Sequence, residues 1–216
     1  PNLALAVGRQ GQVTGEAEWN LVTVGDGIAD FNLFYRGGIQ YFPLYLYDTP
    51  GGEGGLFEHS GAEPERRENF SAAFRAFLDE RYGEHLSPET VLGYIYGVLH
   101  TPTYRKRFAE FLRIDFPRIP FPETGSSGGV PETFLSISAL GNELIEAHLL
   151  RKIPHNISGA QYQGVAETPE SNHLVEKIAY TLATDTVPSE GKLKINATQY
   201  FAPLCPEVFA FRVGGY

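Results

Sequence analysis

Cysteine and methionine are nearly missing from this sequence, which has one cysteine, Cys205, and no methionine. A single cysteine excludes an internal disulfide and any cysteine-rich zinc site. No apolar run reaches the roughly 18 residues that a membrane helix needs, and no signal peptide is recognisable. These absences predict a cytoplasmic protein without a membrane partner. The start at Pro1, together with the missing methionine, leads us to expect a piece of a longer protein.

Signatures of common enzyme sites are also missing. There is no G-x-x-x-x-G-K-[ST] phosphate loop, no G-x-G-x-x-G between a strand and a helix, and no G-x-S-x-G nucleophile elbow. The histidines lack metal-binding spacing, and the scattered carboxylates offer no acid–base pair. We therefore expect no catalytic residue, metal or cofactor in this chain. An enzyme with a site outside these patterns is the less favoured alternative.

Basic residues are fewer than acidic ones, 17 against 26, which gives a net charge of −9. Taken alone, this charge argues against a free-standing nucleic-acid binder. The distribution is uneven, because residues 66–118 carry 9 basic and 7 acidic side chains, while both flanking parts are negative. The basic character is strongest at Arg105-Lys106-Arg107. Such a patch can still contact phosphates if another domain supplies the wider field.

The hydrophobic pattern predicts an α+β fold, with β-rich segments at both ends flanking a central helical block. We assign residues 1–48 to a β-rich part, 49–65 to a loop or linker, 66–151 to a helical part and 152–216 to a mixed, β-rich part. Strands are expected at Leu3 to Val7, Trp19 to Val24, Ile39 to Tyr47, Leu174 to Leu182 and Lys192 to Ile195. Pro43 places the third of these at a sheet edge or interrupts it.

Helical spacing predicts four helices. They run from Arg67 to Tyr82, from Ser87-Pro88 onwards, from Thr101-Pro102 through Leu112, and from Glu132 to Arg151. Gly141 inside the last helix is expected to permit a close helix contact. His100 and His148 fall on apolar helical faces, which is typical of buried structural histidines. Three prolines between Phe116 and Pro122 require an extended segment.

Short stretches over nearly the whole chain carry a further signal. They are Val7-Gly8-Arg9-Gln10, Phe42 to Tyr47, Tyr94 to His100, Pro102 to Arg105, Phe111 to Phe121, Leu140 to Leu144 with His148 to Leu150, Ile195-Asn196 with Thr198 to Phe201, and Val213 to Tyr216. In this order they resemble the C-terminal specificity domain of type ISP restriction–modification enzymes and of the related single-chain type IIG enzymes. The succession YIYGVLH, YR and DFPRIPF is the most specific part.

This resemblance implies a target-recognition domain rather than a whole enzyme. Such enzymes carry an adenine methyltransferase domain upstream that uses S-adenosylmethionine, and type ISP members add nuclease and helicase parts. The implied partners are double-stranded DNA and the methyltransferase domain of the same polypeptide. The implied cofactor, S-adenosylmethionine, belongs to the parent enzyme and not to this chain.

Polar side chains that follow strands are candidates for reading bases. Arg9 and Gln10 end the first strand, and planar donors of this kind suit purine edges. Capping of the strand is the alternative for both residues. Asn196, Thr198 and Gln199 follow a later strand, where they could reach bases or shape a turn.

Basic side chains of the helical part are candidates for phosphate contacts. Arg105, Lys106 and Arg107 lie mainly away from the apolar face of their helix, so a solvated surface is the alternative for them. Arg118 sits in the rigid extended segment between two prolines, where a domain-packing contact is the alternative.

Two other functions compete with DNA recognition. Tyr35, Tyr41, Tyr45 and Tyr47 could form an exposed stacking surface for carbohydrate. Their alternation with apolar residues fits a half-buried strand equally well. The other alternative is a purely structural docking module within a larger enzyme.

Overall fold

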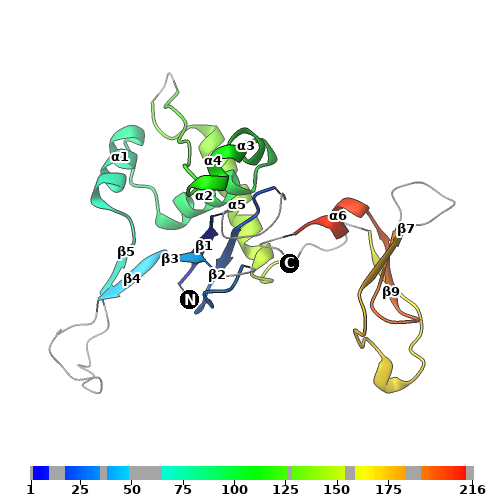
Figure 1. The fold of residues 1–216 in the computed structure, drawn as a ribbon. Coiled ribbons are helices and arrows are strands. Elements are labelled where there is room, and N and C mark those ends of the chain that lie inside the picture. Colours follow the sequence, from blue (N-terminus) through cyan, green and yellow to red (C-terminus); the bar gives the residue numbers. More distant parts are fainter. Residues whose placement is uncertain are drawn as a thin grey trace, which may run out of the picture. The chain divides into compact units, whose positions relative to one another are not determined.

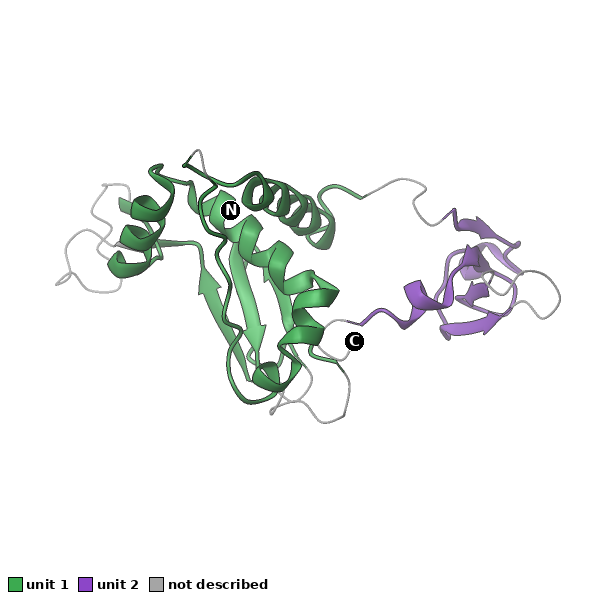
Figure 2. Ribbon diagram, turned by 90° about the horizontal axis from the view of Figure 1, so that it is seen from above, with its two compact units in different colours: residues 1–153, 213–216 green, residues 154–212 purple. Residues whose placement is uncertain are grey.

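The chain divides into two compact units, residues 1–153 with 213–216 and residues 154–212 (Figure 2). The computed structural model describes residues 2–9, 18–34, 38–48, 65–125, 128–153, 159–182 and 191–212. Strands lie toward both ends of the sequence and helices lie in its centre (Figure 1). The predicted α+β class is therefore confirmed.

A three-stranded antiparallel sheet begins unit 1. It consists of β1 (Ala4–Gly8), β2 (Val22–Gly25) and β3 (Ile39–Pro43), with β1 in the middle. The indole nitrogen of Trp19 donates to the carbonyl of Gly8 at 3.0 Å and closes the end of β1. These strands confirm the three that the sequence predicts in this region.

Pro43 marks the place where the third predicted strand breaks. β3 is an edge strand that ends at Pro43, and the chain continues as β4 (Tyr45–Asp48). β4 pairs instead with β5 (Glu65–Glu68) in a separate two-stranded sheet. Because proline cannot donate to a ladder, both predicted consequences, the edge position and the interruption, occur here.

The first predicted helix begins later than expected. Residues 65–68 form β5, and α1 (Ala72–Tyr82) starts only after Ser71, whose hydroxyl accepts from the backbone nitrogen of Phe74. The prediction of a helix from Arg67 is thus wrong at its start. The spacing of Phe70 and Phe74 looks helical, but their rings meet edge-on across the cap at 5.3 Å.

Two long helices form the centre of unit 1. α2 (Pro88–His100) starts at the predicted cap, since the Ser87 hydroxyl accepts from the backbone nitrogen of Thr90. α5 (Glu132–His148) packs against it with Gly141 facing α2. A side chain on Gly141 would lie well inside van der Waals contact of the Gly93 carbonyl oxygen. The close helix contact predicted at Gly141 is therefore confirmed.

The helix predicted from Thr101-Pro102 through Leu112 is divided in two. α3 (Pro102–Arg107) and α4 (Ala109–Ile114) meet at Phe108, whose backbone leaves the helical region with φ −108° and ψ 17°. The prediction of one continuous helix is thus wrong at Phe108, although the Phe108 ring still packs on Tyr104, one turn earlier, at 5.0 Å, as helical spacing requires.

The proline-rich segment after α4 is extended, as predicted. Its backbone is held by three tyrosine hydroxyls that donate to carbonyl oxygens: Tyr82 to Pro122, Tyr94 to Pro120 and Tyr104 to Arg118. These bonds satisfy carbonyls that no sheet partner reaches. The segment therefore has a fixed path across the helices of unit 1.

Unit 2 is built on a four-stranded antiparallel sheet in the order β6-β9-β8-β7. Its elements are β6 (Gln161–Gln163), η2 (Pro169–Ser171), β7 (Ala179–Leu182), β8 (Gly191–Lys194), β9 (Tyr200–Leu204) and α6 (Pro206–Ala210). β8 confirms the predicted strand at residues 192–195. Only the last four residues of the predicted strand at 174–182 are β-structure, because the backbone nitrogens of Glu176 and Lys177 both donate to Ile195 outside the ladder.

Candidate nucleic-acid interface

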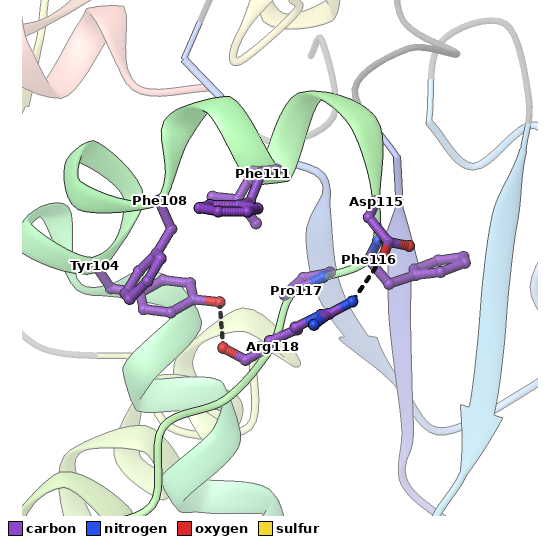
Figure 3. A pocket seen from close by; sticks show the side chains of 8 residues that line it. Tyr104, Phe108, Phe111, Asp115, Phe116, Pro117 and Arg118 are labelled. Carbon is purple, nitrogen blue, oxygen red and sulfur yellow. Dashed lines mark hydrogen bonds and ion pairs between the residues drawn. The ribbon is translucent and has the colours of Figure 1, made fainter.

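α3, α4 and the segment after them enclose a cavity of about 170 Å³ in unit 1. It is lined by Tyr104, Phe108, Phe111, Leu112, Asp115, Phe116, Pro117 and Arg118. Figure 3 shows Phe108 and Phe111 pointing from the helices toward the segment that carries Pro117 and Arg118. The space lies between aromatic side chains of residues 104–111 and the extended segment that follows α4. We call it the aromatic cavity.

Arg118 stands at the mouth of the aromatic cavity. Its carbonyl accepts from the Tyr104 hydroxyl at 2.9 Å, which fixes the backbone as the flanking prolines predict. Its side chain is 88% exposed, and its guanidinium lies 3.5 Å from the Asp115 carboxylate. The side chain is thus not packed within unit 1, and a phosphate contact and a domain-packing contact both stay predictions for it.

Two further predicted residues lie beside the same cavity. The Arg9 guanidinium is 5.4 Å from the ring centroid of Phe116, and the Arg107 guanidinium is 5.8 Å from that of Phe108. Both arginines are exposed. Arg9 and Arg107 thus each lie near a residue that lines the aromatic cavity, and Arg118 lines it; we call these three residues the arginine ring. Gln10 lies outside the described residues.

The remaining two basic candidates differ from each other. Lys106 is exposed, as an outward helix position requires. Arg105 turns inward, against the prediction of an outward side chain: its Nε donates to the Leu99 carbonyl at 2.7 Å, and its guanidinium lies 5.7 Å from the Trp19 ring. The last carbonyls of a helix lack partners within it, and Arg105 supplies one at the end of α2. Burial lowers its pKa.

Two histidines lie near Arg105 and are uncharged at neutral pH. His100 Nδ1 lies 3.2 Å from Arg105 Nη2, and His148 Nδ1 lies 2.6 Å from the Tyr96 hydroxyl. Burial lowers the pKa of His100 to about 3 and also lowers that of His148. Both are thus neutral, partly buried residues, in keeping with the structural role that their positions predict.

The predicted residues of unit 2 build a turn between β8 and β9. The Asn196 side-chain oxygen accepts from the backbone nitrogens of Thr198 at 3.1 Å and Gln199 at 2.7 Å. Gln199 is 1% exposed, and its side-chain oxygen accepts from the backbone nitrogen of His173 at 3.0 Å. Asn196 and Gln199 therefore match the turn-shaping alternative, while Thr198 is half-buried.

The three described tyrosines of the carbohydrate alternative, Tyr41, Tyr45 and Tyr47, do not form one exposed stacking surface. The Tyr41 hydroxyl donates to the Gly27 carbonyl, and the Tyr45 hydroxyl donates to the Glu89 carboxylate, each at 2.7 Å. Tyr47 is 50% exposed, and Tyr35 lies outside the described residues. This arrangement fits the half-buried strand.

The sequence did not reveal the position of Asp115 at the cavity or the exposure of two apolar side chains on α4. Phe111, assigned to an apolar helix face, is 63% exposed, and Ile114 on the same helix is 75% exposed. Tyr104 and Leu112 are buried, as helical spacing predicts, so the exposure of Phe111 is the departure from the predicted apolar face. Within the described ranges, no helix is long and apolar enough to cross a membrane, and no three metal-binding side chains come together.

Solved structures with a similar fold include two Type ISP restriction–modification enzymes and a further protein–DNA complex. The ATP-dependent Type ISP restriction-modification enzyme LlaBIII bound to DNA is 20% identical, with a TM-score of 0.65 over 99% of this chain and 12% of the LlaBIII chain. The DrdV–DNA complex is 24% identical, with a TM-score of 0.65 over 99% of this chain and 19% of that one. A nuclease-deletion mutant of the Type ISP enzyme LlaGI in complex with a DNA substrate mimic is 20% identical. Its TM-score is 0.60 over 99% of this chain and 16% of the LlaGI chain.

The present chain thus spans less than a fifth of each of these enzymes. No curated protein sequence matches it. The profile of the family described as the Type ISP C-terminal specificity domain matches residues 1–216, which confirms the resemblance seen in the sequence. The chain therefore belongs to the Type ISP C-terminal specificity domain family.

Proposed function

We propose that this chain is the DNA target-recognition domain of a restriction–modification enzyme, which reads a DNA site and positions it for a methyltransferase domain. The observation that carries this proposal is the arginine ring around the aromatic cavity in a chain of the specificity-domain family. Exposed guanidinium groups donate in a fixed plane and suit both phosphates and guanine edges. A carbohydrate site is not supported, since Tyr41 and Tyr45 are used within unit 1.

The parent polypeptide would supply the chemistry. An enzyme that methylates adenine extrudes the base from the duplex, so a second domain must hold the DNA in register. In this proposal S-adenosylmethionine binds the methyltransferase domain of the same polypeptide, and the present chain binds no cofactor. Arg107 and Arg118 contact phosphates, while Arg9, at the end of a buried strand, contacts a base edge or a phosphate.

The net charge of −9 predicts that the isolated chain binds duplex DNA weakly, and only through its arginine ring. Each neutralised phosphate contributes about −0.9 to the slope of log affinity against log salt, so three contacts give a slope of about −3. The test is a salt titration of duplex binding by the 216-residue chain, read by fluorescence anisotropy.

A carbohydrate panel read in parallel is the control for the competing function. Binding that is insensitive to salt, or no binding to DNA at low salt, would contradict the proposal. Nanomolar, sequence-selective binding in physiological salt would show instead that the chain holds DNA without help from the parent enzyme.

A further inference from the structure

We infer that the aromatic cavity accepts one pyrimidine base that has left the DNA stack. This inference rests on the proposed function and adds a ligand to the surface that the arginine ring surrounds. The argument depends on three properties of the cavity: its size, its lining and the polar groups at its mouth.

The size of the cavity matches a single six-membered ring. Its volume is about 170 Å³, and an apolar protein cavity of about 150 Å³ is known to hold benzene. A pyrimidine is such a ring with small substituents, so it fits inside. A purine has a second fused ring that would project from the mouth.

The lining is suited to stacking. Phe108, between α3 and α4, and Phe111, on α4, both line the space, and their ring centroids are 6.5 Å apart (Figure 3). Phe111 is 63% exposed, so its ring is covered on few sides by the protein. Stacking of a base on an aromatic side chain strengthens binding and tolerates any base, because every base has a π-face.

The polar groups at the mouth match the edge of a base. Asp115 Oδ1 accepts a hydrogen bond from the backbone nitrogen of Phe116 at 2.8 Å. Asp115 Oδ2 lies 3.5 Å from Arg118 Nη2. A carboxylate acceptor thus stands beside a guanidinium donor. A pyrimidine edge presents the reverse pair, a donor next to an acceptor. An apolar side chain from another protein could fill the cavity but would form no hydrogen bond with either group.

The arginines near the cavity suit the phosphates of a nucleotide. Arg9 and Arg107 approach the cavity against Phe116 and Phe108, which lie in its lining. A base inside the cavity would carry its own phosphates toward these two guanidinium groups. Charge complementarity therefore favours a nucleotide over an apolar peptide segment as the occupant.

The test compares four duplexes of equal length in low salt, using the full chain. One is fully paired, and the others carry a single bulged thymidine, a bulged adenosine or a bulged abasic residue. We expect the thymidine bulge to bind about 10-fold more tightly than the abasic bulge, the size of effect that one stacked base provides. The adenosine bulge should bind more weakly than the thymidine bulge.

Two substitutions on α4 separate the cavity from its surroundings. Phe111→Ala should abolish the difference between the thymidine and abasic bulges, while Ile114→Ala, an exposed neighbour that does not line the cavity, should preserve it. Equal binding of the thymidine and abasic bulges would overturn the inference, and equal binding of adenosine and thymidine would overturn the choice of a pyrimidine. If no duplex binds at all, the proposed function itself fails.

Discussion

Replacing Arg9, Arg107 and Arg118 together by alanine should weaken duplex DNA binding by about 100-fold and bring the salt slope close to zero. The expected loss is large because each arginine supplies one contact to the DNA, and a hydrogen bond to a charged group contributes about 1.5–3 kcal/mol before solvent exposure reduces it. Fold stability should be nearly unaffected, since all three side chains are exposed.

A matched control removes the same charge elsewhere. Lys152, Lys192 and Lys194 are exposed, and none of them lines the aromatic cavity. Replacing these three by alanine should change affinity by no more than a few-fold. An equal loss of affinity in both triple variants would mean that overall charge, and not the arginine ring, attracts the DNA.

Gly141→Ala should destabilise unit 1 by about 3 kcal/mol, the upper end of what overpacking a core costs. The added methyl group would collide with the backbone carbonyl of Gly93 and would lie 2.9 Å from the backbone nitrogen of Gly97. Backbone atoms cannot rotate away as a flexible side chain could, so α2 and α5 would have to separate. That separation would expose the core around Ser138 and Ile145, which are buried on α5.

Tryptophan fluorescence during urea unfolding measures this effect in unit 1 alone, because the chain has one tryptophan, Trp19, which is 3% exposed there. Leu140→Ala is the control, since Leu140 neighbours Gly141 on α5 but is 65% exposed. It should shift stability by less than about 0.5 kcal/mol. Helix propensity alone would make Gly141→Ala stabilising by about 1 kcal/mol, and that result would contradict the packing seen here.

Local chemistry in the sequence was sufficient to predict several elements. Ser87 followed by Pro88 marks the start of α2, because the serine caps the first turn and proline needs no donor there. Pro43 ends an edge strand because proline cannot donate a hydrogen bond to the ladder. Gly141 could be recognised because glycine in a helix costs stability and therefore indicates a contact that needs the space.

Features that depend on tertiary contacts could not be predicted. Helical spacing continues across Phe108 and carries no signal for the break there, and the aromatic cavity depends on the path of the segment after α4. The inward turn of Arg105 depends on the free carbonyl of Leu99 at the end of another helix. The meeting of Arg9 with Phe116 joins residues separated by more than a hundred positions, which a single sequence does not relate.

The central claim is that this chain reads DNA sequence, and affinity selection from a random duplex library tests it most directly. The 216-residue chain would be immobilised and incubated with the library at low salt, and the retained DNA would be sequenced over several rounds. The account predicts enrichment of one sequence motif, and loss of that enrichment in the arginine-ring variant. Retained DNA without any enriched motif would contradict it, because the chain would then bind phosphates without reading bases.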